Sequence, residues 1–130
     1  MATKGKLELI GLAAYLEDLA LAGVDIDAAV GKALAAGAQP ILKQMDALVP
    51  KDTHNLEHHL EVDGPHRTGN FSYVDIGLMN ADKETAIYGN VQEFGSSSVA
   101  AQPYVRPAFK TRKAAAMRVM KDTLKAMGFL

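Results

Sequence analysis

The chain has 130 residues, 48% of them hydrophobic, and contains no cysteine. This length supports one hydrophobic core, so we expect a single domain spanning residues 1–130. The lack of cysteine excludes disulfides, thiolate metal ligands and cysteine nucleophiles. No apolar stretch approaches the roughly 20 residues of a membrane helix, and no signal-peptide core follows the basic start. We therefore expect a soluble protein made in a reducing cytoplasm.

Charge is unevenly distributed, although the whole chain carries only −1. From Arg106 onward there are seven basic residues and one acid, Asp122, so this segment carries +6 and the remainder −7. This split suits DNA binding, or contact between the acidic surface of one copy and the basic segment of another. A solvated helix face is the third possibility. The candidate DNA or partner contacts are Lys110, Arg112, Lys113, Arg118, Lys121 and Lys125.

Periodicity predicts two helices in the first half of the chain, after a short strand near residues 7–11. Apolar residues at helical spacing favour a helix over 12–21. A longer helix is predicted over 27–48, because apolar residues recur every three or four positions. Pro40 interrupts this helix chemically but not in phase, so we expect a kink there and an end at Pro50.

After Pro50 the pattern changes to alternation, which predicts an antiparallel sheet. Strands are expected over 56–62, 71–78 and 85–94, where apolar, β-branched and aromatic residues recur on alternate positions. Residues 63–65 and 68–70 are typical of a turn or short loop. The N-terminal strand is a possible fourth member of the sheet.

A final helix is predicted beyond the polar stretch at residues 95–98. Pro103 holds the preceding segment extended, and Pro107 suits a first helical turn. Its apolar stripe consists of Phe109, Ala116, Met117, Met120, Leu124 and Met127. The order of elements predicts an α+β fold, with a small antiparallel sheet of three to four strands packed by a long kinked helix and a C-terminal helix.

Two sequence strings point to a known family. Glu93-Phe94-Gly95 is followed, after a small polar gap, by Gln102-Pro103-Tyr104-Val105-Arg106-Pro107-Ala108. This pair closely resembles a signature of the tail-completion, or neck, proteins of long-tailed bacteriophages and prophages. In that family the first string ends a strand and the second opens the last helix. Ala47-Leu48-Val49-Pro50 and Thr53-His54-Asn55-Leu56 occupy the places of a weaker match.

The resemblance implies a structural role in the virion and no enzymatic activity or cofactor. Proteins of this family form rings, expected to be hexameric, at the head–tail junction. There they meet the tail-tube or tail-terminator protein and the head-closure or connector proteins, while DNA passes through the lumen. The expected interface residues are Glu93, Phe94, Gly95, Gln102, Pro103, Tyr104, Arg106 and Pro107. A tail-terminator, head-closure or DNA-binding protein is the alternative.

The loop between the two strings has its own physical logic. Arg106 is expected near Glu93, where a charge-assisted pair would lock the base of the loop. The loop begins with the polar stretch 95–98, which is too flexible to hold itself in place, so we expect residues 96–101 to be ordered only by a neighbouring subunit or partner.

The sequence does not favour a metal site or a catalytic site. His54, His58, His59 and His66 lie near Glu57, Glu61 and Asp63 in the sequence, but His58 and His59 would point to opposite faces of a strand and no helical His-Glu-x-x-His spacing exists. Asp75 and Glu93 would share a sheet face without a metal partner. Ser96, Ser97 and Ser98 have no identifiable base.

Overall fold

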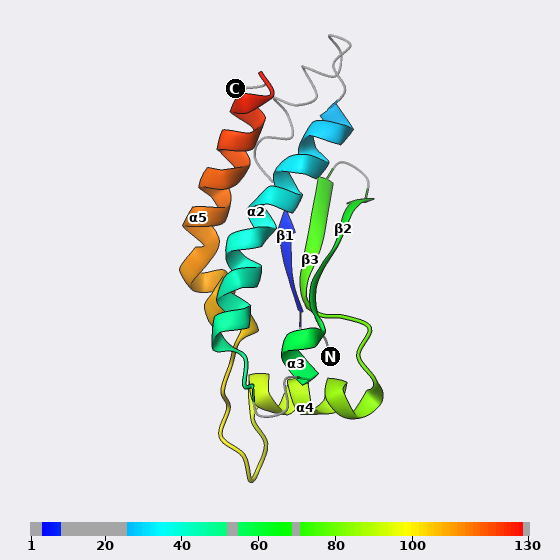
Figure 1. The fold of residues 1–130 in the computed structure, drawn as a ribbon, viewed down its shortest axis with the longest axis vertical. Helices are drawn as coiled ribbons and strands as arrows, with labels where there is room; N and C mark the ends of the chain where they lie inside the picture. Colours follow the sequence, from blue (N-terminus) through cyan, green and yellow to red (C-terminus); the bar gives the residue numbers. More distant parts are fainter. Residues whose placement is uncertain (1–3, 9–25, 52–54, 69–70, 129–130) are drawn as a thin grey trace.

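The structure is a computed structural model that describes residues 4–8, 26–51, 55–68 and 71–128. Its elements, in chain order, are β1 (Lys4–Glu8), α2 (Ile26–Leu48), α3 (Asn55–His58), β2 (Leu60–Thr68), β3 (Phe71–Leu78), α4 (Lys83–Phe94) and α5 (Val105–Ala126). They form an α+β fold, which confirms the predicted class (Figure 1). The helix expected over 12–21 lies outside the described residues.

The sheet has three antiparallel strands in the order β1-β3-β2. An N-terminal strand is thus a member, although it is Lys4–Glu8 and so overlaps the predicted 7–11 only at residues 7 and 8, and β3 lies in the centre. Val74 and Ile76 are fully buried in the core with α2, and alternation directs Tyr73 and Asp75 to the opposite face. The two faces therefore have different chemistry: one is apolar and covered by helices, while the other carries polar groups.

The third strand predicted over 85–94 is wrong, because these residues form helix α4. Asp82 caps the helix: its carboxylate accepts hydrogen bonds from the Thr85 amide at 3.3 Å and the Thr85 hydroxyl at 2.6 Å. The buried residues of α4 are Thr85, Gly89, Gln92 and Glu93. Their spacing is helical, but they are small or polar, so hydrophobic periodicity does not reveal the helix.

The strand predicted over 56–62 is also displaced. Leu56 is buried within the short helix α3, and β2 begins at Leu60 and continues to Thr68. The expected turn at 63–65 lies inside β2, as a register shift against β3 between Asp63 and His66. Gly64, with φ +125°, and a cis peptide bond to Pro65 occupy this bulge.

Helices α2 and α5 pack side by side, and α2 also covers β2 and β3 (Figure 1). Helix α2 continues through Pro40. A Cβ atom on Gly37 would lie 2.5 Å from Met120 Cγ, so the absence of a side chain permits the close crossing of the two helices. Met117 is 40% exposed, so its assignment to the apolar stripe of α5 is wrong, whereas Ala116, Met120 and Leu124 are buried as expected.

Within the described ranges, no helix combines the length and the apolar character needed to cross a membrane.

Candidate functional site

The residues of the two sequence strings meet at one end of the molecule, where α4 ends and α5 begins (Figure 1). Glu93 and Phe94 are the last residues of a helix, not of a strand as the resemblance implied. Gly95 follows as the C-cap residue, with φ +77° and its amide bonded to the Val91 carbonyl at 2.7 Å. Glycine suits this conformation because an L side chain rarely adopts it.

Glu93 lies at the centre of this junction, and its side chain is only 1% exposed. The amides of Tyr104 and Val105 donate to Oε1 at 2.9 and 2.7 Å. The Arg106 amide donates to Oε2 at 3.2 Å. One carboxylate from α4 thus binds three successive backbone amides at the start of α5.

These hydrogen bonds meet a requirement of any helix start. The first amides of a helix have no acceptor within the helix, and Tyr104, the N-cap residue of α5, provides no side-chain cap. Glu93 supplies the missing acceptor, and Pro107 has no N–H that needs one. The negative carboxylate also interacts favourably with the positive end of the α5 dipole. Glu93 therefore caps α5 from another helix.

The surroundings of Glu93 have opposing effects on its pKa. Burial alone would raise the pKa, but the hydrogen bonds from Val105, Arg106 and Tyr104 outweigh burial and hold the pKa below its ordinary value of 4.5. Glu93 is therefore ionised at neutral pH, and both of its oxygens are hydrogen-bonded, which suits a structural role.

Arg106 also pairs with Glu93, as the sequence led us to expect. We call Glu93, the Arg106 side chain and the amides of residues 104–106 the clamp. Its Nε donates to Glu93 Oε2 at 2.8 Å, and its Nη2 donates to the Glu93 carbonyl. The guanidinium lies 4.9 Å from the centre of the Phe94 ring. Because the Arg106 side chain is 57% exposed and Phe94 is 44% exposed, the pair also presents an outer surface.

Tyr104 lies behind the clamp and is fully buried. Its hydroxyl donates to the Gly89 carbonyl at 3.3 Å. A Cβ atom on Gly89 would lie 2.7 Å from Leu78 Cδ2 and 3.0 Å from the Tyr104 hydroxyl. Glu93 and Tyr104, both expected at an interface, therefore lie inside the subunit, where they position the surface residues and do not form the surface.

The loop after Gly95 has hydrogen bonds of its own. The Ser96 amide donates to the Val99 carbonyl at 2.8 Å, and the Ser96 hydroxyl accepts from the amides of Ser98 and Val99. The Gln102 amide donates to the Gln92 carbonyl at 2.7 Å. These bonds define the loop without a neighbour, which counts against the expectation that only a partner orders it.

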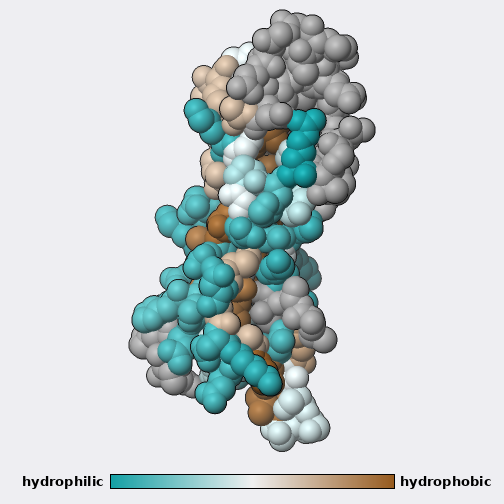
Figure 2. All heavy atoms as spheres, turned by 90° about the vertical axis from the view of Figure 1, so that its right-hand side faces the viewer, coloured by the Kyte–Doolittle hydropathy of each residue, from teal (hydrophilic) through white to brown (hydrophobic). Residues whose placement is uncertain are grey.

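Hydrophobic side chains are exposed at the same end of the molecule. Of the described large hydrophobic residues that are exposed, three lie on α4 and the following loop: Ile87, Phe94 and Val99, at 53%, 44% and 41%. Figure 2 shows hydrophobic surface at this lower end. We call Phe94, Val99 and Arg106 the junction surface. It combines exposed apolar area with a cation held in a defined position.

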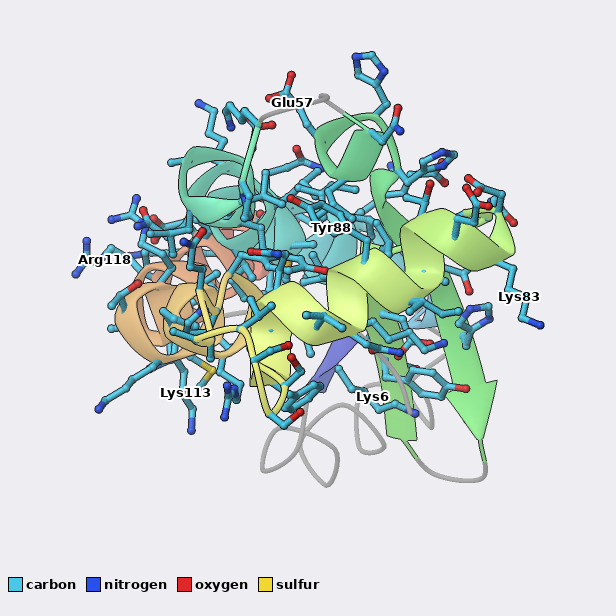
Figure 3. The ribbon with its side chains drawn as sticks, turned by 90° about the horizontal axis from the view of Figure 1, so that it is seen from below. Lys6, Glu57, Lys83, Tyr88, Lys113 and Arg118 are labelled. Atoms are coloured by element: carbon cyan, nitrogen blue, oxygen red, sulfur yellow. The ribbon has the colours of Figure 1, made fainter. Side chains whose placement is uncertain are left out.

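The six basic residues of α5 are all exposed: Lys110, Arg112, Lys113, Arg118, Lys121 and Lys125. Lys113 and Arg118 point outward from the helix (Figure 3). None of the six forms an ion pair with an acidic residue in the described part of the chain. The helix therefore presents a basic surface that its own subunit does not neutralise.

The histidines and carboxylates that the sequence offered as candidate clusters lie on several different elements. Glu57 pairs with Lys51 at 3.2 Å, and His58 lies on α3. Asp75 and Glu93 do not share a sheet face, because Glu93 belongs to α4. His54 lies outside the described residues. A different trio does converge, namely Asp63, His66 and Asp75, whose candidate ligand atoms lie within 4.8 Å of one another.

Comparison of the chain with protein families, curated proteins and solved structures found no match in any of the three.

Proposed function

We propose that this chain is a structural subunit of a bacteriophage or prophage particle. In this proposal it forms a ring, expected to be hexameric, at the head–tail junction, where it completes the tail and joins the tail tube to the DNA-filled head. Its partners are further copies of itself, the tail-tube or tail-terminator protein, and the head-closure or connector proteins. It has no catalytic role, and DNA passes through the lumen without sequence-specific contacts.

The observation that carries this proposal is the clamp at the α4–α5 junction. The two strings that resemble the neck-protein signature are separated by six residues, 96–101, and the Glu93 carboxylate joins them through Tyr104, Val105 and Arg106. Both oxygens of that carboxylate accept hydrogen bonds within the subunit, so Glu93 has the bonding of a structural element.

The clamp also explains why a binding surface would be located here. It fixes the direction in which α5 leaves α4, and it holds Arg106 against the exposed Phe94 ring at 4.9 Å. Side chains held in place before association lose less conformational entropy when a partner binds. Aromatic residues and arginine are also the types most enriched among residues that dominate binding energy. The junction surface therefore suits subunit contact.

Deletion and complementation in the phage or prophage that encodes the chain test the proposal. Particles without it are expected to show filled heads and tails that do not join in electron micrographs, and the wild-type chain should restore joining. Phe94→Ser should fail to restore it, because the exposed ring is lost. Leu48→Ser is the matched control, since Leu48 is similarly exposed (38% against 44%) but belongs neither to the junction surface nor to the basic helix α5.

The outcomes also separate related roles. Tails of uncontrolled length would assign the terminator role, and heads that lose their DNA would assign the head-closure role. Mass spectrometry of purified wild-type particles should detect the chain. Its absence from particles, or normal particles after deletion, would contradict the proposal.

DNA binding through α5 is the second candidate, and one observation favours it. Six exposed cations on one helix, unpaired within the described chain, would release counterions on contact with phosphates. The same cations would equally suit the acidic surface of another subunit, because the rest of the chain carries −7.

A further inference from the structure

Three potential metal ligands meet on the sheet face that lies away from α2. Asp63 on β2 and Asp75 on β3 are direct register partners. His66 Nε2 lies 3.1 Å from Asp63 Oδ2. One nitrogen and two carboxylate oxygens, one from each residue, lie within 4.8 Å of one another.

The bulge in β2 creates this arrangement. In a regular strand, residues three apart point to opposite faces, so Asp63 and His66 would be separated by the sheet. Their partners on β3, Asp75 and Tyr73, are only two residues apart and share one face. The extra residue in β2 therefore turns His66 to the face that holds both aspartates, which is an established use of bulges.

Asp75 provides an independent indication of a ligand. It is only 7% exposed, and its Oδ1 is buried without a hydrogen-bond partner among the described residues. Its other oxygen pairs with Lys4 Nζ at 3.3 Å. A buried carboxylate oxygen that lacks a donor is costly, and a bound cation, a water molecule or a proton would satisfy it.

We propose that Asp63, His66 and Asp75 bind one divalent cation of the zinc class. One imidazole nitrogen with two carboxylate oxygens is a donor set that zinc accepts, with water completing a tetrahedral site. Zinc–ligand distances of about 2.0–2.2 Å require the three donors to draw closer together. The side chains of Asp63 and His66 are 54% and 41% exposed, so both have room to rotate inward.

An aromatic ring and two lysines lie next to the proposed site. The Tyr73 ring, 5.3 Å from the His66 ring, orients the imidazole from the side. Lys4 Nζ, which pairs with Asp75 Oδ2 at 3.3 Å, places a positive charge beside the site and so opposes cation binding. Lys6, labelled in Figure 3, lies over the Tyr73 ring at 3.8 Å and adds a second positive charge to this face. The bound ion would fasten the bulge of β2 to β3 and so stabilise the sheet.

Calorimetric titration of the full chain with ZnCl2, together with thermal unfolding with and without zinc, tests this site. One ion should bind per chain and raise the melting temperature. Asp63→Asn, His66→Ala and Asp75→Asn should each weaken binding by about tenfold or more, because each removes a direct ligand. His58→Ala and Asp122→Asn, which change exposed residues outside the cluster, should bind zinc as the wild type does.

Asp63→Asn keeps the test valid if Asp75→Asn fails to fold, because Asp63 is exposed. Lys4→Met should bind zinc more tightly than the wild type, since the opposing positive charge is gone. The proposal is overturned if the wild type binds no zinc, if binding survives all three ligand changes, or if His58→Ala loses binding to the same extent as His66→Ala.

Discussion

A single buried carboxylate organises the end of this molecule. Glu93 accepts hydrogen bonds from three amides and one guanidinium, although its side chain is 1% exposed. Burial of a charge is unfavourable unless the charge is paired and bonded, and here every requirement is met by residues 104–106. Glu93 therefore fixes the start of α5 relative to the end of α4.

We predict that Glu93→Gln lowers the free energy of unfolding by about 3 kcal/mol at neutral pH, because it removes the charge from a buried pair and directs an amide group towards N–H donors. Urea denaturation followed by circular dichroism measures this change. Glu93→Asp, which keeps the charge but shortens the reach, is the companion variant and should lose less stability than Glu93→Gln.

The same residue predicts a pH dependence. The folded pKa of Glu93 lies below its ordinary value of 4.5, because hydrogen bonds outweigh the effect of burial. Its contribution to stability is therefore complete above 4.5 and is lost as the pH falls through the lower folded pKa. As the pH falls below 4.5, the wild type should therefore lose more stability than Glu93→Gln. Equal losses would remove Glu93 from the account, since Asp82, whose pKa is also lowered, is common to both proteins.

At the scale of elements, the crossing of α2 and α5 holds the helical layer together. Ala33, Ala38 and Ala116 are fully buried, and Gly37 faces Met120 so closely that no Cβ atom fits without displacement. Small residues allow the two backbones to approach. Met120 and Leu124 of α5 then belong to the same hydrophobic core as Val74 and Ile76 of the sheet.

Gly37→Ala is expected to destabilise the fold by about 1–3 kcal/mol through overpacking. This direction opposes the intrinsic preference of helices for alanine over glycine, which is worth about 1 kcal/mol. The added methyl group would lie 2.5 Å from Met120 Cγ and 3.1 Å from the Ala116 carbonyl oxygen. Thermal unfolding measures the effect, with Gln39→Ala at an exposed site of α2 as the control. An increase in stability would show that the crossing relaxes without cost.

At the scale of the whole molecule, charge is unevenly distributed along the chain, and exposed apolar side chains lie on α4 and its loop. The segment from Arg106 onward carries +6 against −7 elsewhere, while α4 and its loop expose Ile87, Phe94 and Val99. A molecule with separate basic and acidic regions can join its own copies with one repeated contact, as a closed ring requires.

The basic charge of α5 leads to a prediction about the affinity of the isolated subunit for DNA. If α5 contacts protein, the purified chain should not bind duplex DNA tightly at about 50 mM salt, and Lys113→Glu with Arg118→Glu should fold normally but fail to restore particles. Filter binding over a salt series measures the affinity. The DNA role would be favoured by tight binding with a strong salt dependence. In that case the logarithm of the association constant falls by about 0.9 per phosphate contact for each tenfold increase in salt concentration.

The sequence by itself determined the elements that carry their own periodicity. Helix α2, predicted over 27–48, is Ile26–Leu48, and the strand predicted over 71–78 is Phe71–Leu78. Pro107 lies in the first turn of α5 as expected. The Glu93–Arg106 pair was also expected and is present, although Glu93 lies at the end of helix α4 and not at the strand end from which the pair was inferred. In these segments, local pattern and final structure agree.

Only the tertiary structure decided α4, the bulge in β2 and the grouping of Asp63, His66 and Asp75. The buried face of α4 consists of Thr85, Gly89, Gln92 and Glu93, so it lacks the apolar period by which a helix is recognised. The faces of β2 depend on one inserted residue, and a shift of one residue exchanges the two faces of a strand. Such choices are made by the packing of distant segments, which the local pattern does not contain.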